Sequence, residues 1–319
     1  MPTPQQFMDA LGLSVPIVQA PIGPAATPAL VNAVANRGGL GMLAGSALGP
    51  DKLAAALDQI YPENRARCGV NLINAMPGDA VLTTALDAGV KTLSFFWGID
   101  ESAISKAKRA GAVVMQTIGS PSEVGPAIAA GADIIVAQGW EAGGHVWGNV
   151  STLALVPAAV NAAGDVPVIA AGGIANHQSM AAALSLGAAG VWIGTRFLAS
   201  TESGAHPSYK ERLTQASAED TFHGVLYDVG WPGAPARSLI NSTTRAWQAD
   251  GSKTGDARPG AADVIAHDGQ GNPIPRYFVD IPTAETTGIV EGMAHYAGQS
   301  VSQVTNILPA AQIIDQMFS

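Results

Sequence analysis

The chain has 319 residues and a formal net charge of −9, from 16 lysines and arginines against 25 aspartates and glutamates. Nucleic acids and anionic membrane surfaces are bound through clusters of basic side chains, so this charge balance argues against both as partners. Charged residues make up 13% of the chain, whereas about 25% is typical. We therefore expect extensive burial, either inside the subunit or between the subunits of a homo-oligomer.

The N-terminal residues and the cysteine content set further limits. The first nine residues, M-P-T-P-Q-Q-F-M-D, lack the positive start and apolar core of a secretion signal, and no uncharged apolar run is long enough to span a bilayer. We expect a cytoplasmic protein. Cys68 is the single cysteine, so an internal disulfide is impossible, and its apolar surroundings predict a buried side chain.

Short apolar runs alternate with helical patterns between residues 17 and 193, which is typical of βα units and a parallel sheet. No G-x-G-x-x-G fingerprint follows the first strand, which disfavours an open doubly wound sheet. We therefore predict an α/β fold, a (β/α)8 TIM barrel. The strands are predicted at residues 17–20, 41–43, 69–72, 92–95, 113–117, 134–137, 168–170 and 191–193, and the helices at 28–36, 50–61, 78–88, 101–110, 122–130, 153–163 and 178–186.

The βα rhythm stops after residue 197. Residues 200–282 are richer in polar residues, glycine and proline, as in D-G-S-K-T-G-D-A-R-P-G at 250–260. We predict a barrel over residues 1–200, a small, partly helical insertion or lid after strand eight over 201–283, and C-terminal helices over 284–319 that pack back on the barrel.

The most informative motif is G-W-E-A-G-G-H at residues 139–145, directly after the predicted strand 134–137. A strand that ends in a glycine-bearing turn can hold a histidine over a ligand at the carboxyl edge of a parallel sheet. We predict His145 as a catalytic acid/base group. The other histidines have weaker claims and none pairs with carboxylates at metal-ligand spacing, so no metal site is predicted; they are His177, His206, His223, His267 and His295.

The next two strands also open into glycine, in A-A-G-G-I and G-T-R-F. Backbone N–H groups of such turns can hold a phosphate without any lysine. Gly172, Gly173, Gly194 and Thr195 therefore predict a phosphate-bearing cofactor. The alternative is that these glycines only permit tight turns.

Four amide side chains lie at or near strand ends of the predicted barrel. A buried amide is costly unless it is hydrogen-bonded, so these amides indicate either a polar ligand such as an isoalloxazine ring or bonds to one another and to the barrel backbone. They are Gln19, Asn71, Gln116 and Gln138.

Together these features resemble the nitronate monooxygenase family, formerly called 2-nitropropane dioxygenases, which are FMN-dependent (β/α)8 barrels. The resemblance rests on V-Q-A-P-I-G near the start, G-V-N-L, Q-G-W-E-A-G-G-H, A-A-G-G-I, G-T-R-F and Y-A-G-Q-S, and covers essentially the whole chain. It implies FMN bound by the barrel, with contacts from Pro21, Ile22, Gly23, Asn71, Gln116, Gln138, Gly143, Gly144, Gly173, Gly194, Thr195 and Gln299.

The resemblance also implies the chemistry. Family members oxidise an alkyl nitronate, or a nitroalkane, with O2 to a carbonyl compound and nitrite. His145 occupies the family's catalytic position, as a base toward neutral nitroalkanes or as a group that orients the nitronate. Trp140, Trp147 and Phe96 either form an apolar wall near the flavin or pack in the core and lid.

Three alternatives remain open at this stage. Related barrels with the same G-G-H turn are NAD(P)H-dependent flavin reductases that act on quinones or enoyl thioesters. A flavin-binding protein without turnover would keep the cofactor and lose the reaction. A barrel similar to inosine-monophosphate dehydrogenase would need a catalytic cysteine in the loop after strand six, whereas Cys68 lies in an early strand.

Overall fold

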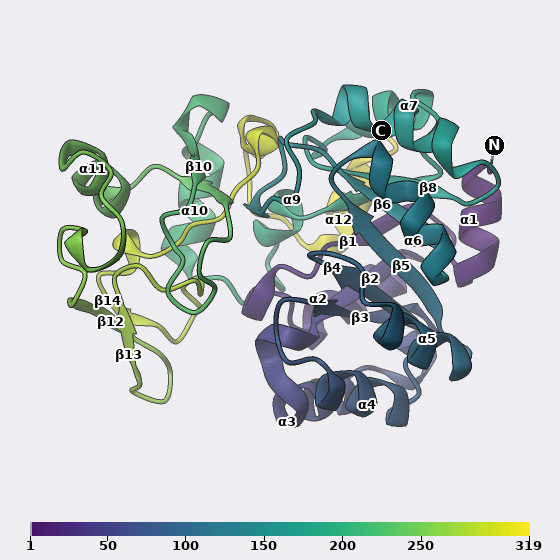
Figure 1. Cartoon of the computed structure of the whole chain (residues 1–319), viewed down its shortest axis with the longest axis horizontal. Helices are drawn as coiled ribbons and strands as arrows, with labels where there is room; N and C mark the ends of the chain where they lie inside the picture. The colour runs from purple at the N-terminus through teal and green to yellow at the C-terminus, as the bar shows by residue number, and fades with distance from the viewer. Residues whose placement is uncertain (1) are drawn as a thin grey trace.

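The computed structural model describes residues 2–319 and contains a closed barrel of eight parallel strands (Figure 1). All eight predicted strands form the barrel, which confirms the predicted fold. In barrel order they are β1 (Ile17–Gln19), β2 (Leu40–Ala44), β3 (Cys68–Ile73), β4 (Thr92–Phe96), β5 (Val113–Ile118), β6 (Ile134–Gln138), β8 (Val168–Ala171) and β9 (Gly190–Ile193).

Helices connect the successive barrel strands, and their boundaries follow the predicted ones within a few residues. The main difference is the helix after β2, which begins at Gly45 and bends at Gly49, where φ is +72°, just before Pro50. These seven helices are α2 (Pro28–Asn36), α3 (Gly45–Asp58), α4 (Asp79–Asp87), α5 (Glu101–Arg109), α6 (Val124–Ala130), α7 (Thr152–Ala163) and α8 (His177–Ser185), and the short α9 (Thr195–Leu198) follows the last strand.

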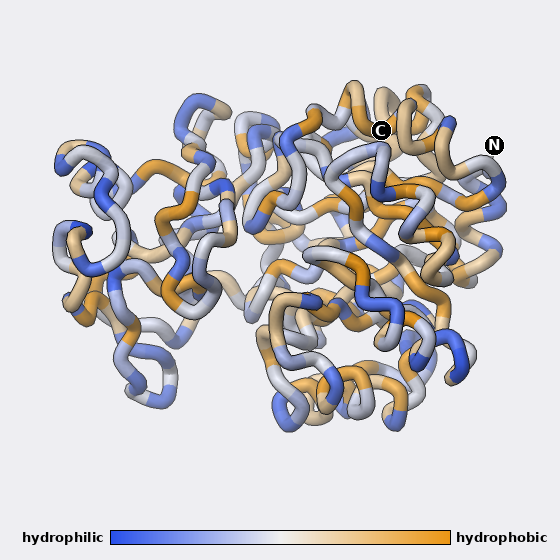
Figure 2. The backbone as a smooth tube through the Cα atoms, viewed as in Figure 1, coloured by the Kyte–Doolittle hydropathy of each residue, from blue (hydrophilic) through white to orange (hydrophobic). Residues whose placement is uncertain are grey.

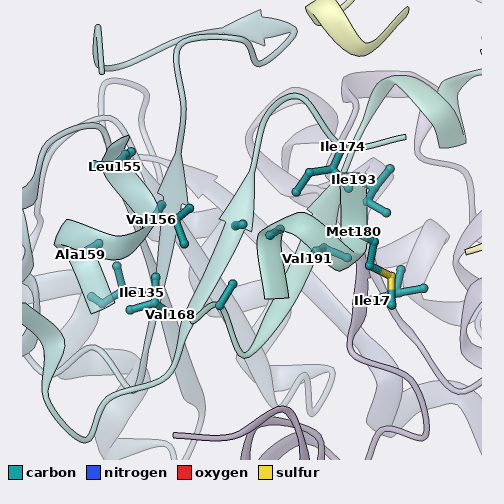
Figure 3. Close-up of a cluster of buried hydrophobic side chains, with 14 of the residues drawn as sticks. Ile17, Ile135, Leu155, Val156, Ala159, Val168, Ile174, Met180, Val191 and Ile193 are labelled. Carbon is teal, nitrogen blue, oxygen red and sulfur yellow. The ribbon is translucent and has the colours of Figure 1, made fainter. Parts of the chain in front are cut away.

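The apolar core has an inner and an outer layer. Inside the barrel, strand residues such as Met42 and Met115 pack with Phe7 of the N-terminal helix α1 (Pro4–Leu11). Outside the barrel, strand residues such as Ile135 and Val168 pack against α7, as Figure 3 shows. Cys68 is buried in the outer layer, as predicted.

The chain after β9 forms a smaller lobe beside the barrel (Figure 1). Blue, hydrophilic segments are frequent in this lobe, whereas orange, hydrophobic segments are more frequent in the barrel (Figure 2). The lobe has small antiparallel sheets as well as helices. Its elements are α10 (Pro207–Gln215), β10 (Thr221–Gly224), β11 (Ala236–Leu239), α11 (Ser242–Ala249), β12 (Val264–His267), β13 (Pro273–Pro275) and β14 (Thr287–Gly288).

The chain then returns to the barrel, where α12 (Ala310–Gln316) packs against α2. The limits 1–200, 201–283 and 284–319 stay a proposal. Strand β14 pairs with β12 of the small lobe, and Met293 packs with Ile265 there. These contacts favour an end of the insertion nearer residue 295 than residue 283.

Candidate active site

A cavity of about 370 Å³ lies at the carboxyl ends of the barrel strands, between the barrel and the small lobe. Eleven of the thirteen residues predicted for the site line it, while Gln116 and Gln299 do not. Those that line it are Pro21, Ile22, Gly23, Asn71, Gln138, Gly143, Gly144, His145, Gly173, Gly194 and Thr195.

One end of the cavity presents free backbone donors. The turn after β8 has positive φ at Gly172 (+97°) and Gly173 (+76°), a conformation that favours glycine. In the part of the chain that the structure describes, the N–H groups of Gly173, Ile174 and Gly194 have no protein acceptor. Thr195 accepts a hydrogen bond from the N–H of Gly298 at 3.0 Å. An arrangement of free N–H groups in adjacent turns fits an anionic phosphate.

The four amides differ in what they bind. Gln19 bonds to the barrel backbone, since its Oε1 accepts a hydrogen bond from the Met42 N–H at 3.1 Å. For this residue, the alternative of a bond within the barrel is correct. Asn71 lines the cavity and donates to the Ser94 hydroxyl at 2.8 Å. Gln116 donates to the Gly98 carbonyl at 3.0 Å, but its buried Oε1 has no partner among the described residues.

Gln138 holds the turn that carries His145. Its Nε2 donates to the His145 carbonyl at 3.0 Å, and its Oε1 accepts from the Trp147 N–H at 3.0 Å. The turn itself requires glycine at two positions. A Cβ on Gly143 would lie 2.4 Å from the nitrogen of Gly298, and Gly144 has φ of +72°. Gln138 and the glycines together fix the backbone from which the imidazole projects.

The end of this turn forms a short strand that we did not predict from the sequence. β7 (Gly144–His145) pairs antiparallel with β11 of the small lobe, so that Arg237 lies opposite Gly144. The buried Arg237 guanidinium donates from Nη2 to the Trp140 carbonyl at 2.9 Å and lies 4.0 Å from the centre of the Trp140 ring. Arg237 therefore holds the turn through contacts outside the cavity lining.

The His145 imidazole lies among aromatic rings. Its centroid is 4.1 Å from that of Trp231, with 29° between the ring planes, 5.5 Å from Tyr296 and 6.1 Å from Trp97. Burial lowers the pKa of His145 to about 4, and its Nε2 is buried without a hydrogen-bond partner among residues 2–319. His145 is therefore a neutral imidazole at physiological pH.

Of the three residues considered for an apolar wall, only Phe96 lines the cavity. Trp147 lies outside the cavity lining, where its ring contacts Trp97 at 4.9 Å and its Nε1 donates to Glu123 at 2.7 Å. Trp140 packs beneath Arg237. Two further aromatic residues, Trp231 and Tyr296, line the cavity from the small lobe. Trp231 lies in no motif, and Tyr296, the first residue of Y-A-G-Q-S, was given no role of its own.

Of the other histidines, His223 packs against Trp140 and His267 is exposed on β12, while three have structural contacts. His177 lies 2.9 Å from the Met317 carbonyl, His206 caps α10, and His295 stacks on Tyr209. Among residues 2–319, no group of three or more His, Cys, Asp or Glu side chains is arranged to hold a metal ion. Over the same range, no helix has the length and apolar character needed to cross a membrane.

Comparisons with known proteins identify related chains. The family model for nitronate monooxygenase matches residues 5–75 and 63–319. A probable nitronate monooxygenase of Bacillus subtilis is 33% identical over 74% of this chain and 79% of its own. A Mycobacterium tuberculosis protein, (3aS,4S,5R,7aS)-5-hydroxy-7a-methyl-1-oxo-octahydro-1H-indene-4-carboxyl-CoA dehydrogenase, is 39% identical over 72% of this chain, and the match spans 64% of that relative.

Two solved structures are similar over nearly the whole chain. FabK from Thermotoga maritima has a TM-score of 0.85 at 32% identity, with 100% of this chain and 95% of that chain covered. The nitroalkane oxidase from Streptomyces ansochromogenes has a TM-score of 0.77 at 29% identity, with 96% and 95% covered. The resemblance found in the sequence is thereby confirmed, and this chain belongs to the nitronate monooxygenase family of flavin oxidoreductases.

Proposed function

We propose that this protein binds FMN and uses O2 to oxidise alkyl nitronates to a carbonyl compound and nitrite. The free N–H groups of Gly173, Ile174 and Gly194 would hold the phosphate, since a turn with unpaired donors binds an anion without a lysine. The cavity-lining Asn71 would face a polar edge of the ring, and the buried, unpartnered Oε1 of Gln116 would come within reach only after its side chain turned toward the cavity. When bound, FMN supplies the electron acceptor for the nitronate and the electron donor for O2.

The protonation state of His145 supports a particular role for this residue in the proposed reaction. An imidazole whose pKa is about 4 is neutral at pH 7 and is a weak base toward a neutral nitroalkane. The same neutral ring has an N–H to donate to an oxygen of a nitronate, which has already lost its carbon-bound proton. Between the two roles predicted for His145, these properties favour orientation of a nitronate over proton abstraction from a nitroalkane.

A second candidate function is NAD(P)H-dependent reduction of a quinone or an enoyl thioester. The observation that favours it is the likeness to FabK from Thermotoga maritima along the full chain, which includes the small lobe. The two functions differ in what reduces the flavin: a nitronate in the first, a nicotinamide in the second.

Anaerobic stopped-flow spectroscopy of the purified holoenzyme separates the two candidates. The protein is mixed with ethyl nitronate in one experiment and with NADH or NADPH in another, and the flavin absorbance is followed. We expect bleaching by the nitronate, nitrite release after O2 is admitted, and no bleaching by either nicotinamide on the same timescale. Bleaching by a nicotinamide alone would replace the proposed function with the reductase. Mass spectrometry of the acid-released flavin tests for FMN.

A further inference from the structure

The cavity wall beside His145 is aromatic and carries no cation. Phe96 contributes from the end of β4, and Trp231 and Tyr296 contribute from the small lobe. None of the residues that line the cavity is a lysine or an arginine, and the one carboxylate among them is Asp280. Lys52 does not line the cavity, and its charge acts on Asp280. The wall therefore has no fixed positive charge for an anionic group on the substrate.

Trp231 is the central residue of this wall. Its ring stacks on His145 and contacts Trp97 at 4.8 Å and Phe96 at 6.5 Å between centroids. Only 6% of the residue is exposed, and its indole packs against the rings of His145, Trp97 and Phe96. Ring contacts thus hold the indole against the imidazole, and an apolar ligand group in the cavity can pack against the same aromatic wall.

We propose that the preferred substrate carries a flat or bulky apolar group, and that Trp231 sets this preference by packing against that group beside His145. The inference rests on the proposed function, of which it specifies the substrate class. Burying an apolar ring against aromatic faces is favourable. A second anionic group, such as the carboxylate of propionate 3-nitronate, would be buried unpaired against a wall that has no cation and one acid.

The first test compares three nitronates with the holoenzyme by kcat/KM. Phenylmethane nitronate has an apolar ring, ethyl nitronate is small, and propionate 3-nitronate has a second charge. We expect the phenyl compound to exceed ethyl nitronate by about tenfold, the scale of one buried aromatic contact, and propionate 3-nitronate to be the poorest substrate. A preference for propionate 3-nitronate would overturn the proposal.

Substitutions assign the preference to Trp231. In Trp231→Leu we expect the ratio of kcat/KM for phenylmethane nitronate over ethyl nitronate to fall about tenfold. In Trp231→Phe we expect the ratio to return most of the way to its wild-type value. The matched control is Trp247→Leu, in the same lobe: Trp247 packs on Phe222 and does not line the cavity. An unchanged ratio in Trp231→Leu, or an equal loss in the Trp247 variant, would refute the role of Trp231.

A binding experiment keeps the inference independent of turnover. Acetophenone and propionate are titrated into the holoenzyme, and binding is followed by the change in flavin absorbance. We expect acetophenone to bind more tightly than propionate. Trp231→Leu should weaken the binding of acetophenone by about tenfold, and Trp247→Leu should leave it unchanged. If no nitronate reduces the flavin, the proposed function is wrong. The binding result still shows whether the cavity prefers an apolar ligand group. Equal binding of acetophenone to the wild type and to Trp231→Leu would reject the inference.

Discussion

His145 combines a low pKa with a position at the cavity, and this combination predicts a distinctive pH profile. Burial lowers the pKa of His145 to about 4, so the neutral form persists above that pH, and protonation removes it only as the pH falls through about 4. We expect kcat/KM for a nitronate to show no inflection near pH 6.5, the ordinary pKa of histidine. Steady-state kinetics of the holoenzyme from pH 4.5 to 8 tests this. A protonation step near 6.5 that disappears in His145→Gln would contradict it.

Substitution of His145 distinguishes orientation from base catalysis. His145→Ala should retain the flavin and lose about 10²-fold in kcat/KM for nitronates, the scale of a positioned catalytic group. His145→Gln keeps an N–H donor, so we expect it to recover part of that loss if the histidine orients the substrate. Flavin content and the kinetics of both variants with a nitronate and with a neutral nitroalkane are the measurements. A loss confined to the neutral nitroalkane, with nitronate turnover unchanged, would favour the base, and unchanged turnover of both substrates in His145→Ala would remove the residue from the mechanism.

His295 predicts how stability depends on pH. Only 1% of the residue is exposed, its ring stacks on Tyr209 with 4.3 Å between centroids, and burial lowers its pKa to about 4. The unfolded chain, with an ordinary histidine pKa of about 6.5, therefore binds a proton first as the pH falls. From His295 alone, the free energy of unfolding should fall by about 2 kcal/mol between pH 7 and pH 5.

Urea unfolding of the flavin-saturated protein at pH 7 and pH 5 measures this dependence. His295→Gln removes the titrating group, so its loss of stability between the two pH values should be smaller than that of the wild type by the same amount. The comparison uses the difference between pH values, because the substitution also removes the stacking on Tyr209. An identical pH dependence in the two proteins would mean that His295 titrates normally in the folded state.

At the scale of elements, the pairing of β7 with β11 makes Arg237 a positioning residue for His145. Arg237→Met should lower kcat/KM for nitronates by about tenfold, since a charge-assisted hydrogen bond to the Trp140 carbonyl is lost. The displaced turn would let water reach His145, so the acidic inflection of kcat/KM should move upward from about 4 toward 6.5. Arg237→Lys should recover part of both effects.

The control for this prediction is Arg276→Met. Arg276 is a partly buried arginine of the same lobe, and its side chain contacts Asp263 and Thr243 rather than the turn. We expect the control to lower stability without moving the acidic inflection. A shift of equal size in both variants would show that Arg237 acts only through the stability of the lobe.

Local patterns predicted the barrel elements because each βα unit carries its own signals. Apolar runs mark the strands, and glycine marks helix ends, as at Gly131, where φ is +110°. Strand β7 escaped prediction because its pairing partner lies about ninety residues later in the chain. Arg237 and Trp231 were missed for the same reason: neither belongs to a local motif, and each acts through a contact distant in sequence.

At the scale of the whole molecule, the two lobes contribute different parts of the proposed site (Figure 1). The barrel provides the free turn donors at Gly173 and Gly194, while the small lobe provides Trp231 and Tyr296. The barrel half of the site could be predicted from its motifs, because tight turns and close approaches demand particular residues, such as Gly143 beside Gly298. The aromatic wall could not, because packing between lobes accepts many apolar residues and leaves no fixed pattern.

The position of α12 bears on the order in which the protein can assemble during synthesis. Ile313 and Ile314 of α12 share a core cluster with Leu30 and Val34 of α2, and Arg37 pairs with Asp315. Helix α2 is synthesised early, but α12, which covers it, is synthesised only after the entire small lobe. A nascent chain halted at residue 200 would have all eight barrel strands and an apolar face on α2 that stays uncovered until α12 has been synthesised.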